Sequence, residues 1–254
     1  MILKRLSVAI AEQNWFTVFL EILIVVVAIF LGLQVDDWNS VRKERVRETD
    51  YLQRIDAELA EDIAEFEAGI TTANRRIGYA RLVLAVLADP TLATSAPTEF
   101  VNALVRAGFT YSPVVSDNTF EEIKSTGELG IIRDVALRTS VTKYYQQIRQ
   151  YSQWGYLREM NQTEYLKRQA GILTPTQFEA FWVSRLGMEV TSEEAKAVLE
   201  KLASKPALAE WLPVTIAFLA QDGDYSRKSK ESAENLRKKI AEFLAKDSAD
   251  RTSY

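Results

Sequence analysis

Acid–base chemistry in this chain would depend on carboxylates, because its 254 residues include no histidine and no cysteine. The absence of histidine excludes the commonest general base near neutral pH, serine–histidine–aspartate triads and histidine-based zinc sites. The absence of cysteine excludes disulfides, thiolate metal ligands and thiol nucleophiles. The sequence also has no GxxxxGK[ST] loop, GxGxxG loop, HExxH motif or serine elbow.

The carboxylates themselves form no recognisable catalytic or metal-binding motif. Glu121 and Glu122 stand beside Lys124, which is typical of an ordinary helix surface. The sequence DGD at 222–224 resembles a fragment of a calcium loop, but the glutamate expected downstream is absent, so a turn is the preferred interpretation. We therefore expect no catalysis, no metal and no cofactor.

An apolar run of twenty residues, from Phe16 to Val35, predicts a transmembrane helix. Twenty helical residues rise about 30 Å, which matches the hydrocarbon core of a bilayer. A cleavable signal would have a shorter run and a small-x-small site, which the sequence LGLQVDDWN at 31–39 lacks. Trp15 and Trp38 would lie about 34 Å apart and are predicted to anchor the two membrane interfaces. The alternative is a buried core helix of a soluble domain.

One acidic residue, Glu21, lies inside this run and defines one face of the helix. Val25, Ala28 and Gly32 follow it at offsets that place all four residues on the same stripe. Small residues four apart allow two helices to approach closely, and a carboxyl group can hydrogen-bond across such a contact. We therefore predict a helix–helix interface, formed with a second copy or with a partner membrane protein. The alternative is a Glu21 that is protonated or reaches toward the headgroups.

Basic residues flank the run on both sides, and they leave its orientation open. Two precede it and four follow it: Lys4, Arg5, Arg42, Lys43, Arg45 and Arg47. The count favours a cytoplasmic carboxy-terminal body, whereas a short positive amino tail usually stays inside the cell. We expect a single-pass protein of the bacterial inner membrane with a periplasmic body, and a cytoplasmic body is the alternative.

Beyond the run, the chain predicts helices almost throughout. From Leu52 to Leu87, apolar residues recur mostly at three- and four-residue intervals with charges between them. We expect one long amphipathic helix over 39–88 that continues from the span and bends near Gly69. No later segment alternates with period two for long enough to predict a sheet.

Capping signals divide the rest of the chain into further helices. The expected helices cover 98–107, 117–127 with Asp117 as N-cap, 134–170 with Asp134 as N-cap, 174–187, 191 onward with a Thr191–Glu194 capping box, and a last stretch that is interrupted or bent at Pro206 and Pro213 and runs toward Lys246. The predicted fold is all-α, with a single N-terminal transmembrane helix that continues into the long amphipathic helix and packs with further helices in a membrane-proximal bundle. The predicted regions are a tail (1–14), the transmembrane helix (15–38), the charged helix (39–88), a helical body (98–247) and a second tail (248–254).

Two surface patterns bear on how the helices pack. An acidic run over 56–67 and a basic run over 237–239 would face each other if the last helix returns beside the first, although solvated faces are the more usual reading of such runs. Aromatic residues between 135 and 170 recur at three- and four-residue spacing, which is more typical of a core than of a ligand-stacking face.

Three features together resemble a known group of proteins. They are the acidic residue early in the span, the sequence GLQVDDWN at 32–39 and the sequence TFEEIKSTGELGIIRDVALRTSVTKYY at 119–145. This combination resembles an uncharacterised bacterial family of single-pass membrane proteins that carry a domain of unknown function. The resemblance implies the topology, and it implies no activity, cofactor or catalytic residue.

Three functions fit the sequence. The favoured one is a membrane-anchored helical scaffold or accessory protein, whose partners are the lipid bilayer and another membrane-embedded chain. The alternative is a sensor or ligand-binding domain with a pocket among Tyr144, Tyr151, Trp154 and Trp182, and a carboxylate- and metal-dependent hydrolase is less favoured. A net charge of −4 argues against nucleic acid as a partner. A packed body without a cleft would favour the scaffold, and a pocket with convergent polar groups would favour the ligand-binding domain.

Overall fold

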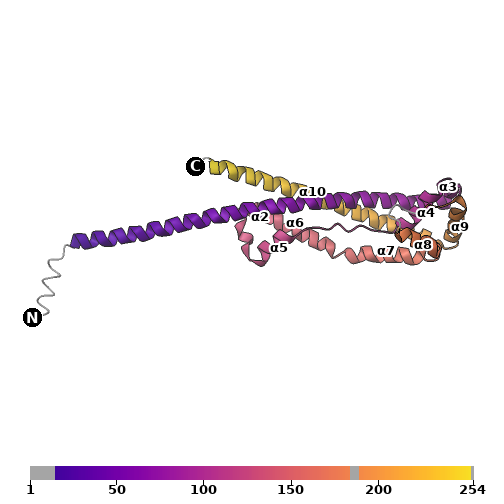
Figure 1. The fold of residues 1–254 in the computed structure, drawn as a ribbon, viewed down its shortest axis with the longest axis horizontal. Helices are drawn as coiled ribbons and strands as arrows, with labels where there is room; N and C mark the ends of the chain where they lie inside the picture. The colour runs from indigo at the N-terminus through magenta and orange to yellow at the C-terminus, as the bar shows by residue number, and fades with distance from the viewer. Residues whose placement is uncertain (1–14, 184–188, 253–254) are drawn as a thin grey trace, which may run out of the picture. The chain divides into compact units, whose positions relative to one another are not determined.

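The structure is a computed structural model that describes residues 15–183 and 189–252, with the side chains of residues 15–18, Glu21, Trp182 and 250–252 outside the described part. The regular structure in the described ranges is helical and includes no strand (Figure 1). The helices in chain order are α2 (Trp15–Ala88), α3 (Thr91–Ser95), α4 (Pro97–Arg106), α5 (Asn118–Ser125), the 3₁₀ helix η1 (Glu128–Ile131), α6 (Val135–Ser152), α7 (Gly155–Gln169), α8 (Pro175–Val183), α9 (Ser192–Ala203) and α10 (Pro206–Thr252). The prediction of an all-α fold is confirmed.

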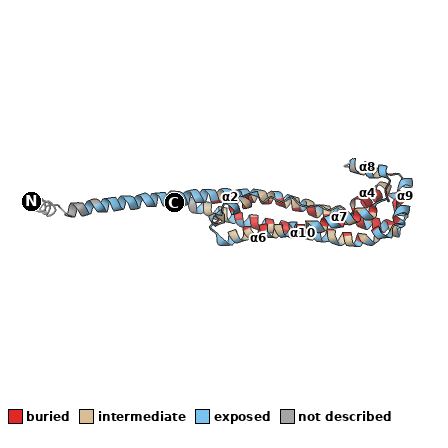
Figure 2. Ribbon diagram, turned by 90° about the horizontal axis from the view of Figure 1, so that it is seen from below, coloured by how far each residue is buried: buried red, intermediate tan, exposed pale blue. Residues whose placement is uncertain are grey.

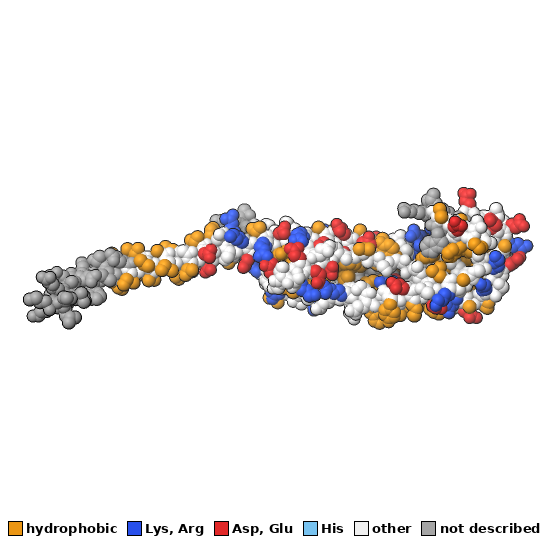
Figure 3. Space-filling model, turned by 60° about the horizontal axis from the view of Figure 1, so that its bottom comes forward, with side chains coloured by type: hydrophobic (Ala, Val, Ile, Leu, Met, Phe, Trp, Pro, Cys, Tyr) orange, Lys and Arg blue, Asp and Glu red, His pale blue; other side chains and the backbone are white. Residues whose placement is uncertain are grey.

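The chain divides into two compact units, Met1–Tyr51 and Leu52–Tyr254. In the first unit, α2 contains a segment that is long and apolar enough to cross a membrane, and none of that segment is buried. Figure 3 shows it covered with hydrophobic side chains. A core helix of a soluble protein would be mostly buried, so the exposure argues against that alternative. The helix is not interrupted at Asn39 or Ser40, so the expected continuation from the span into the amphipathic helix is confirmed.

The second unit, called the bundle below, is built on three long helical layers: α2 from Leu52 onward, α6 with α7, and α10 (Figures 1 and 2). Buried positions on α2 recur alternately three and four residues apart, at 52, 55, 59, 62, 66, 69 and 73. This spacing is the coiled-coil pattern, in which one apolar seam faces the neighbouring helices. The predicted amphipathic periodicity is therefore confirmed, and its buried face is the one that contacts α6 and α10.

Small residues allow α2 and α10 to approach closely. A methyl group added at Gly69 would lie 2.8 Å from Ser226 Oγ, and one added at Gly223 would lie 3.2 Å from Ala73 Cβ. Gly69 therefore serves packing, and α2 is a single helix through it. The turn predicted at 222–224 is wrong, because these residues lie within α10, where the glycine makes room for α2.

The far end of the bundle holds a second core, where α3, α4 and α9 pack on the ends of the long helices. Phe100, Leu104, Tyr165 and Leu202 are fully buried there, and the Tyr165 hydroxyl donates a hydrogen bond to the Leu104 carbonyl oxygen at 2.5 Å. The short helix α3 occupies a stretch that we expected to be a loop, and α4 begins at Pro97, one residue before the expected start.

The single helix expected over 134–170 is wrong, because the structure has two helices, α6 and α7, separated at Gln153 and Trp154. Trp154 N donates to Tyr151 O at 3.0 Å, and Leu157 N donates to Trp154 O at 3.1 Å, so the chain tightens into a turn with three-residue hydrogen bonds. Gly155 follows, and glycine is a weak helix former. The sequence predicted one helix because the three- and four-residue spacing of the aromatic residues continues from α6 across the turn into α7.

Most of the predicted caps are present. The Asp134 carboxylate accepts a hydrogen bond from Leu137 N at 2.9 Å, and Thr191 with Glu194 forms the expected capping box. Thr174 Oγ1 accepts from Gln177 N at 3.2 Å, while the expected end of this helix at Gly187 lies outside the described residues. The interruption expected at Pro206 is the start of α10, which contains Pro213 and extends beyond the expected Lys246.

Three carboxylates of α2 hold the irregular segment 109–117 and the first turn of α5 along the bundle. Their bonds run from Tyr111 Oη (2.7 Å) and Val114 N (3.1 Å) to Glu65, from Ser116 N (3.0 Å) to Asp62, and from Thr119 N (3.0 Å) and Oγ1 (2.7 Å) to Glu58. They satisfy amide groups that have no helical partner. The Asp117 side chain makes no cap hydrogen bond, so this predicted capping role is wrong, and Glu58 accepts the bond from the first turn of α5 instead.

The expected contact between the acidic and basic runs is confirmed at one pair. Arg237 Nε and Nη2 donate to the two carboxylate oxygens of Asp56 at 2.8 and 3.0 Å. Lys239 instead donates to Ser140 Oγ at 2.9 Å. The bidentate pair fixes the antiparallel register of α2 and α10. The contacts of Gly69 with Ser226 and of Gly223 with Ala73 follow the same register.

Candidate functional site

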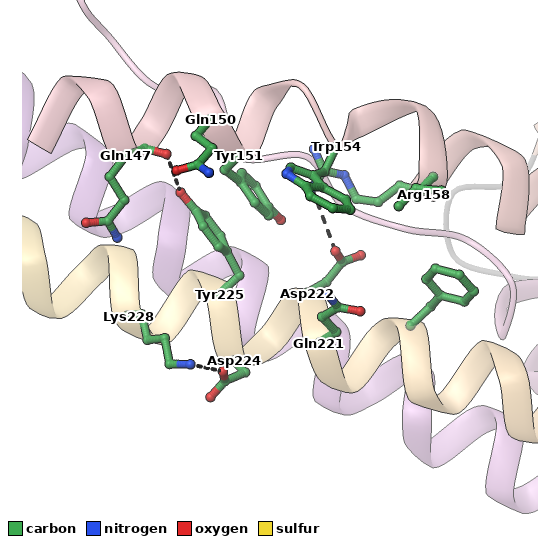
Figure 4. Close-up of a pocket in the computed structure, with 12 residues that line it drawn as sticks. Gln147, Gln150, Tyr151, Trp154, Arg158, Gln221, Asp222, Asp224, Tyr225 and Lys228 are labelled. Atoms are coloured by element: carbon green, nitrogen blue, oxygen red, sulfur yellow. Dashed lines mark hydrogen bonds and ion pairs between the residues drawn. The ribbon is translucent and has the colours of Figure 1, made fainter.

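A pocket of about 280 Å³ opens in the bundle between α6 and α7 on one side and α10 on the other (Figure 4). The side chains from α6, α7 and the turn between them are Gln147, Gln150, Tyr151, Trp154, Leu157 and Arg158. The side chains from α10 are Phe218, Gln221, Asp222, Asp224, Tyr225 and Lys228. The break between α6 and α7 therefore lies at the pocket, and Trp154 from that break is half-exposed in its wall.

A loose ion pair lies in the wall of the pocket. Arg158 is buried, and its Nη1 lies 3.7 Å from Asp222 Oδ1, which is longer than a hydrogen bond. The guanidinium also lies over the Tyr151 ring, 4.3 Å from its centroid, in a cation–π contact. Burial raises the pKa of Asp222 to about 6, although the charge of Arg158 opposes this shift.

Four buried polar atoms around this pair lie outside hydrogen-bond geometry with any other protein atom, although the Tyr151 hydroxyl and the Arg158 guanidinium are both close enough to the Asp222 carboxylate to favour its charged form. They are Nε and Nη1 of Arg158, Oδ2 of Asp222 and the hydroxyl oxygen of Tyr151. A buried polar group without a partner costs about 1–3 kcal/mol, and the cost is larger for charged groups. Native proteins seldom leave such groups unpaired, and here all four belong to residues that line one pocket. The four atoms have almost no exposed surface, so a bound molecule would pair with them after a small shift of these side chains toward the pocket.

Aromatic rings form much of the remaining wall. The Tyr151 and Tyr225 rings are stacked, with 2° between their planes, and the Tyr225 hydroxyl donates to the Gln147 carbonyl oxygen at 3.3 Å. Burial raises the pKa of the Tyr151 phenol well above its usual range, so this hydroxyl stays neutral. At the rim, Lys228 Nζ lies 2.8 Å from Asp224 Oδ2. The inner pair and the rim pair together leave the pocket without a large net charge.

The predicted membrane sites fall outside this pocket. Val25, Ala28 and Trp38 are exposed on α2, and no described atom beyond the adjacent turns of the same helix lies within 4 Å of a methyl group added at Gly32. The side chains of Trp15 and Glu21 lie outside the described part. The helix–helix interface along Glu21, Val25, Ala28 and Gly32 therefore stays a prediction.

The predicted ligand-binding aromatics are only partly brought together. Tyr151 and Trp154 line the pocket, whereas Tyr144 is buried against α2, where its hydroxyl donates to Asp62 Oδ2 at 2.6 Å. The side chain of Trp182 lies outside the described part.

Sequence reasoning missed Arg158 and Asp222, although a signal for each was present. On α10, the buried positions 215, 219, 226 and 229 continue the three- and four-residue spacing, and Asp222 falls on that spacing. Arg158 stands likewise three residues before buried Asn161 and seven before buried Tyr165. A charged residue at a core position of a helical repeat is costly unless it is paired, so it points to a specific role.

Among the described residues, no group of three or more acidic side chains is placed to hold a metal ion. No protein-family model matches the chain, and no similar curated protein or solved structure was found. The resemblance to an uncharacterised bacterial family therefore stays a prediction, and no activity comes to this chain from a relative.

Proposed function

We propose that this protein is a membrane-anchored helical binding protein whose bundle takes up a small molecule in the pocket between α6, α7 and α10. The observation that carries this proposal is the set of incompletely hydrogen-bonded polar atoms on Arg158, Asp222 and Tyr151, three residues that line one pocket. Ligand pockets typically combine apolar walls with a few polar groups that fix the orientation of the ligand. This pocket has that composition.

From the sequence alone, a scaffold was favoured over a ligand-binding domain, and the pocket supports the opposite ranking. A scaffold needs surfaces for partners, and nothing in such a role explains a buried arginine with two unpaired nitrogen atoms. A bound molecule explains it, because the ligand would supply the missing acceptors. Ligand binding is therefore the better-supported role for the bundle.

The proposed location is the bacterial inner membrane, crossed once by residues 15–38, with the bundle in the periplasm. The unburied apolar segment of α2 supports the span, and Trp38, which is 67% exposed, supports an interfacial anchor. The side of the membrane is tested with a Ser248→Cys variant and an impermeant thiol reagent, because the native chain has no thiol. Labelling of intact spheroplasts is expected, and labelling only after lysis would place the bundle in the cytoplasm.

The span supports a second role, association with another membrane-embedded chain through the Glu21 face. Ala28 and Gly32 are exposed on α2, so a second helix has access to both. Detergent-solubilised pull-down with mass spectrometry tests this role by comparing the wild type with Glu21→Leu. Loss of a recovered protein in the variant is expected, and identical recoveries would contradict the role of this face.

Ligand binding is tested with the full-length protein in nanodiscs, screened against a small-molecule library by ligand-observed NMR. We expect compounds whose signals are attenuated by the wild type and by Arg81→Leu, but not by Arg158→Leu. Arg81 is the matched control, because it is exposed on α2 and lies outside the pocket. Asp222→Asn serves as a second pocket variant, and circular dichroism melts of all variants show whether each bundle folds. A screen with no compound that depends on Arg158 or Asp222 in folded variants would overturn the proposal.

A further inference from the structure

The ion pair in the pocket wall restricts the chemistry of a ligand. Arg158 has unpaired donors and Asp222 has an unpaired acceptor, and the two groups are only 3.7 Å apart at their nearest atoms. A molecule that satisfies both must therefore carry an acceptor and a donor close together. The separation also exceeds a hydrogen bond, so the two charges do not fully satisfy each other.

We propose that the ligand is a single zwitterionic α-amino acid with an aromatic side chain. This inference rests on the proposed function and assigns the ligand class of the same pocket. The carboxylate of such a ligand accepts from Arg158, and its ammonium group donates to Asp222. The two ligand groups are bonded to one carbon atom, which gives the close spacing that the protein pair requires.

Charge balance favours a zwitterion over a neutral ligand. Arg158 is buried and the Asp222 side chain is only 17% exposed, and a neutral amide would leave each charge without a new opposite partner. Hydrogen bonds between charged groups are roughly twice as strong as those between neutral groups. A ligand with only one charge would draw one residue away from the existing ion pair and leave the other with a weaker partner, which is costly in a largely buried site.

The rest of the wall fits an apolar side chain. Leu157 and Phe218 offer aliphatic and aromatic surface, and Trp154 lies at the exposed edge, where it can cover a bound ring. The volume of about 280 Å³ is near the lower end of the range for ligand pockets. It therefore suits one amino acid better than a peptide.

The experiment measures binding to full-length protein in nanodiscs by isothermal titration calorimetry. The probes are L-phenylalanine and L-tryptophan, and the comparators are 3-phenylpropionate, which lacks the ammonium group, and phenethylamine, which lacks the carboxylate. We expect at least one probe to bind, with each comparator weaker by about tenfold or more. Arg158→Leu and Asp222→Asn should each weaken the probe by about tenfold or more, while Arg81→Leu should not change its affinity.

Three outcomes overturn the inference: no binding of either probe, a comparator that binds as tightly as its parent amino acid, or probe binding that is unchanged in both pocket variants. The library screen separates these results from a failure of the proposed function. Compounds of another class that require Arg158 would leave the pocket as a binding site and overturn only the amino acid assignment.

Discussion

Asp62 and Arg158 are buried and Asp222 is largely buried, in helices whose other buried residues are mostly apolar. Asp62 has its partners within the protein, namely the Tyr144 hydroxyl and the Ser116 amide. Arg158 and Asp222 keep atoms without partners. This difference separates a buried carboxylate with a structural role from a pair that faces a ligand.

The buried Asp62 makes the stability of the bundle depend on pH. Burial raises its pKa from 3.8 to about 6, so between these values the native chain holds a proton that the unfolded chain has released. This contribution to the free energy of unfolding is fully present below the unfolded pKa of 3.8 and is lost as the pH rises through about 6. Relative to the wild type, Asp62→Asn should gain up to about 3 kcal/mol between about pH 4 and about pH 7.5. Urea unfolding at both pH values measures the gain.

Glu61→Gln is the matched control for this comparison, because Glu61 is the exposed neighbour of Asp62 on α2. Its stability relative to the wild type should change much less over the same pH interval, because the charge of Glu61 is the smallest of the named causes that raise the pKa of Asp62. If Asp62→Asn behaves like this control, the pKa of Asp62 in the folded protein is close to its ordinary value and the proposed pH dependence is contradicted.

Gly108 lies where no side chain fits. A methyl group there would be 2.1 Å from Tyr165 Cγ, and the Tyr165 ring is fully buried. Gly108→Ala should therefore lower the free energy of unfolding by about 3 kcal/mol, as expected for overpacking of a core. Gly78→Ala should instead raise it by about 1 kcal/mol, because that position on α2 has nothing within 4 Å. Urea denaturation compares the two variants, and equal effects would contradict the close contact at Tyr165.

At the scale of elements, the irregular segment 109–117 and the first turn of α5 depend on α2 for hydrogen bonds. Glu58→Ala removes the acceptor of Thr119 N and Oγ1, so hydrogen exchange at 116–120 should accelerate and stability should fall by about 1–3 kcal/mol. Exchange mass spectrometry detects the change. Glu61→Ala, on the exposed face of the same helix, should leave exchange in this segment unaltered. Equal exchange in the two variants would contradict the role of Glu58.

The register of α2 against α10 is tested by reversing the charges of the Asp56–Arg237 pair. Both side chains are partly exposed, so Arg237→Glu should cost only about 1 kcal/mol of stability. The double variant Asp56→Arg with Arg237→Glu should recover most of that loss, whereas Lys238→Glu, on the exposed side, should have little effect. Thermal melts in low salt make the comparison. An unrecovered double variant would indicate a different register.

At the scale of the whole molecule, the two compact units predict different solubilities. The full chain should partition into the membrane fraction and require detergent, because its apolar segment is unburied. Residues 41–252 expressed alone should stay in the aqueous fraction and unfold cooperatively, because the bundle holds its own core. Sedimentation and circular dichroism measure both properties. A full chain that stays soluble without detergent would remove the proposed anchor.

The sequence by itself determined the helical class, the apolar segment near the amino end and most helix boundaries. These features depend on periodicity and on caps, such as Asp134 with Leu137 or Thr191 with Glu194, whose residues are close together along the chain. It failed at the turn between α6 and α7, because the apolar periodicity continues across it.

Only the tertiary structure decided what the polar residues of the bundle do. Asp222 looked like part of a turn, and Glu58 and Asp62 looked like part of a solvated acidic run, since their partners are about 60 or more residues away along the chain. Whether a charged side chain faces water, an amide group or a pocket depends on which helices pack against it. That choice follows from the antiparallel register of α2 and α10 and from the break beside Trp154, and neither is encoded in a local pattern.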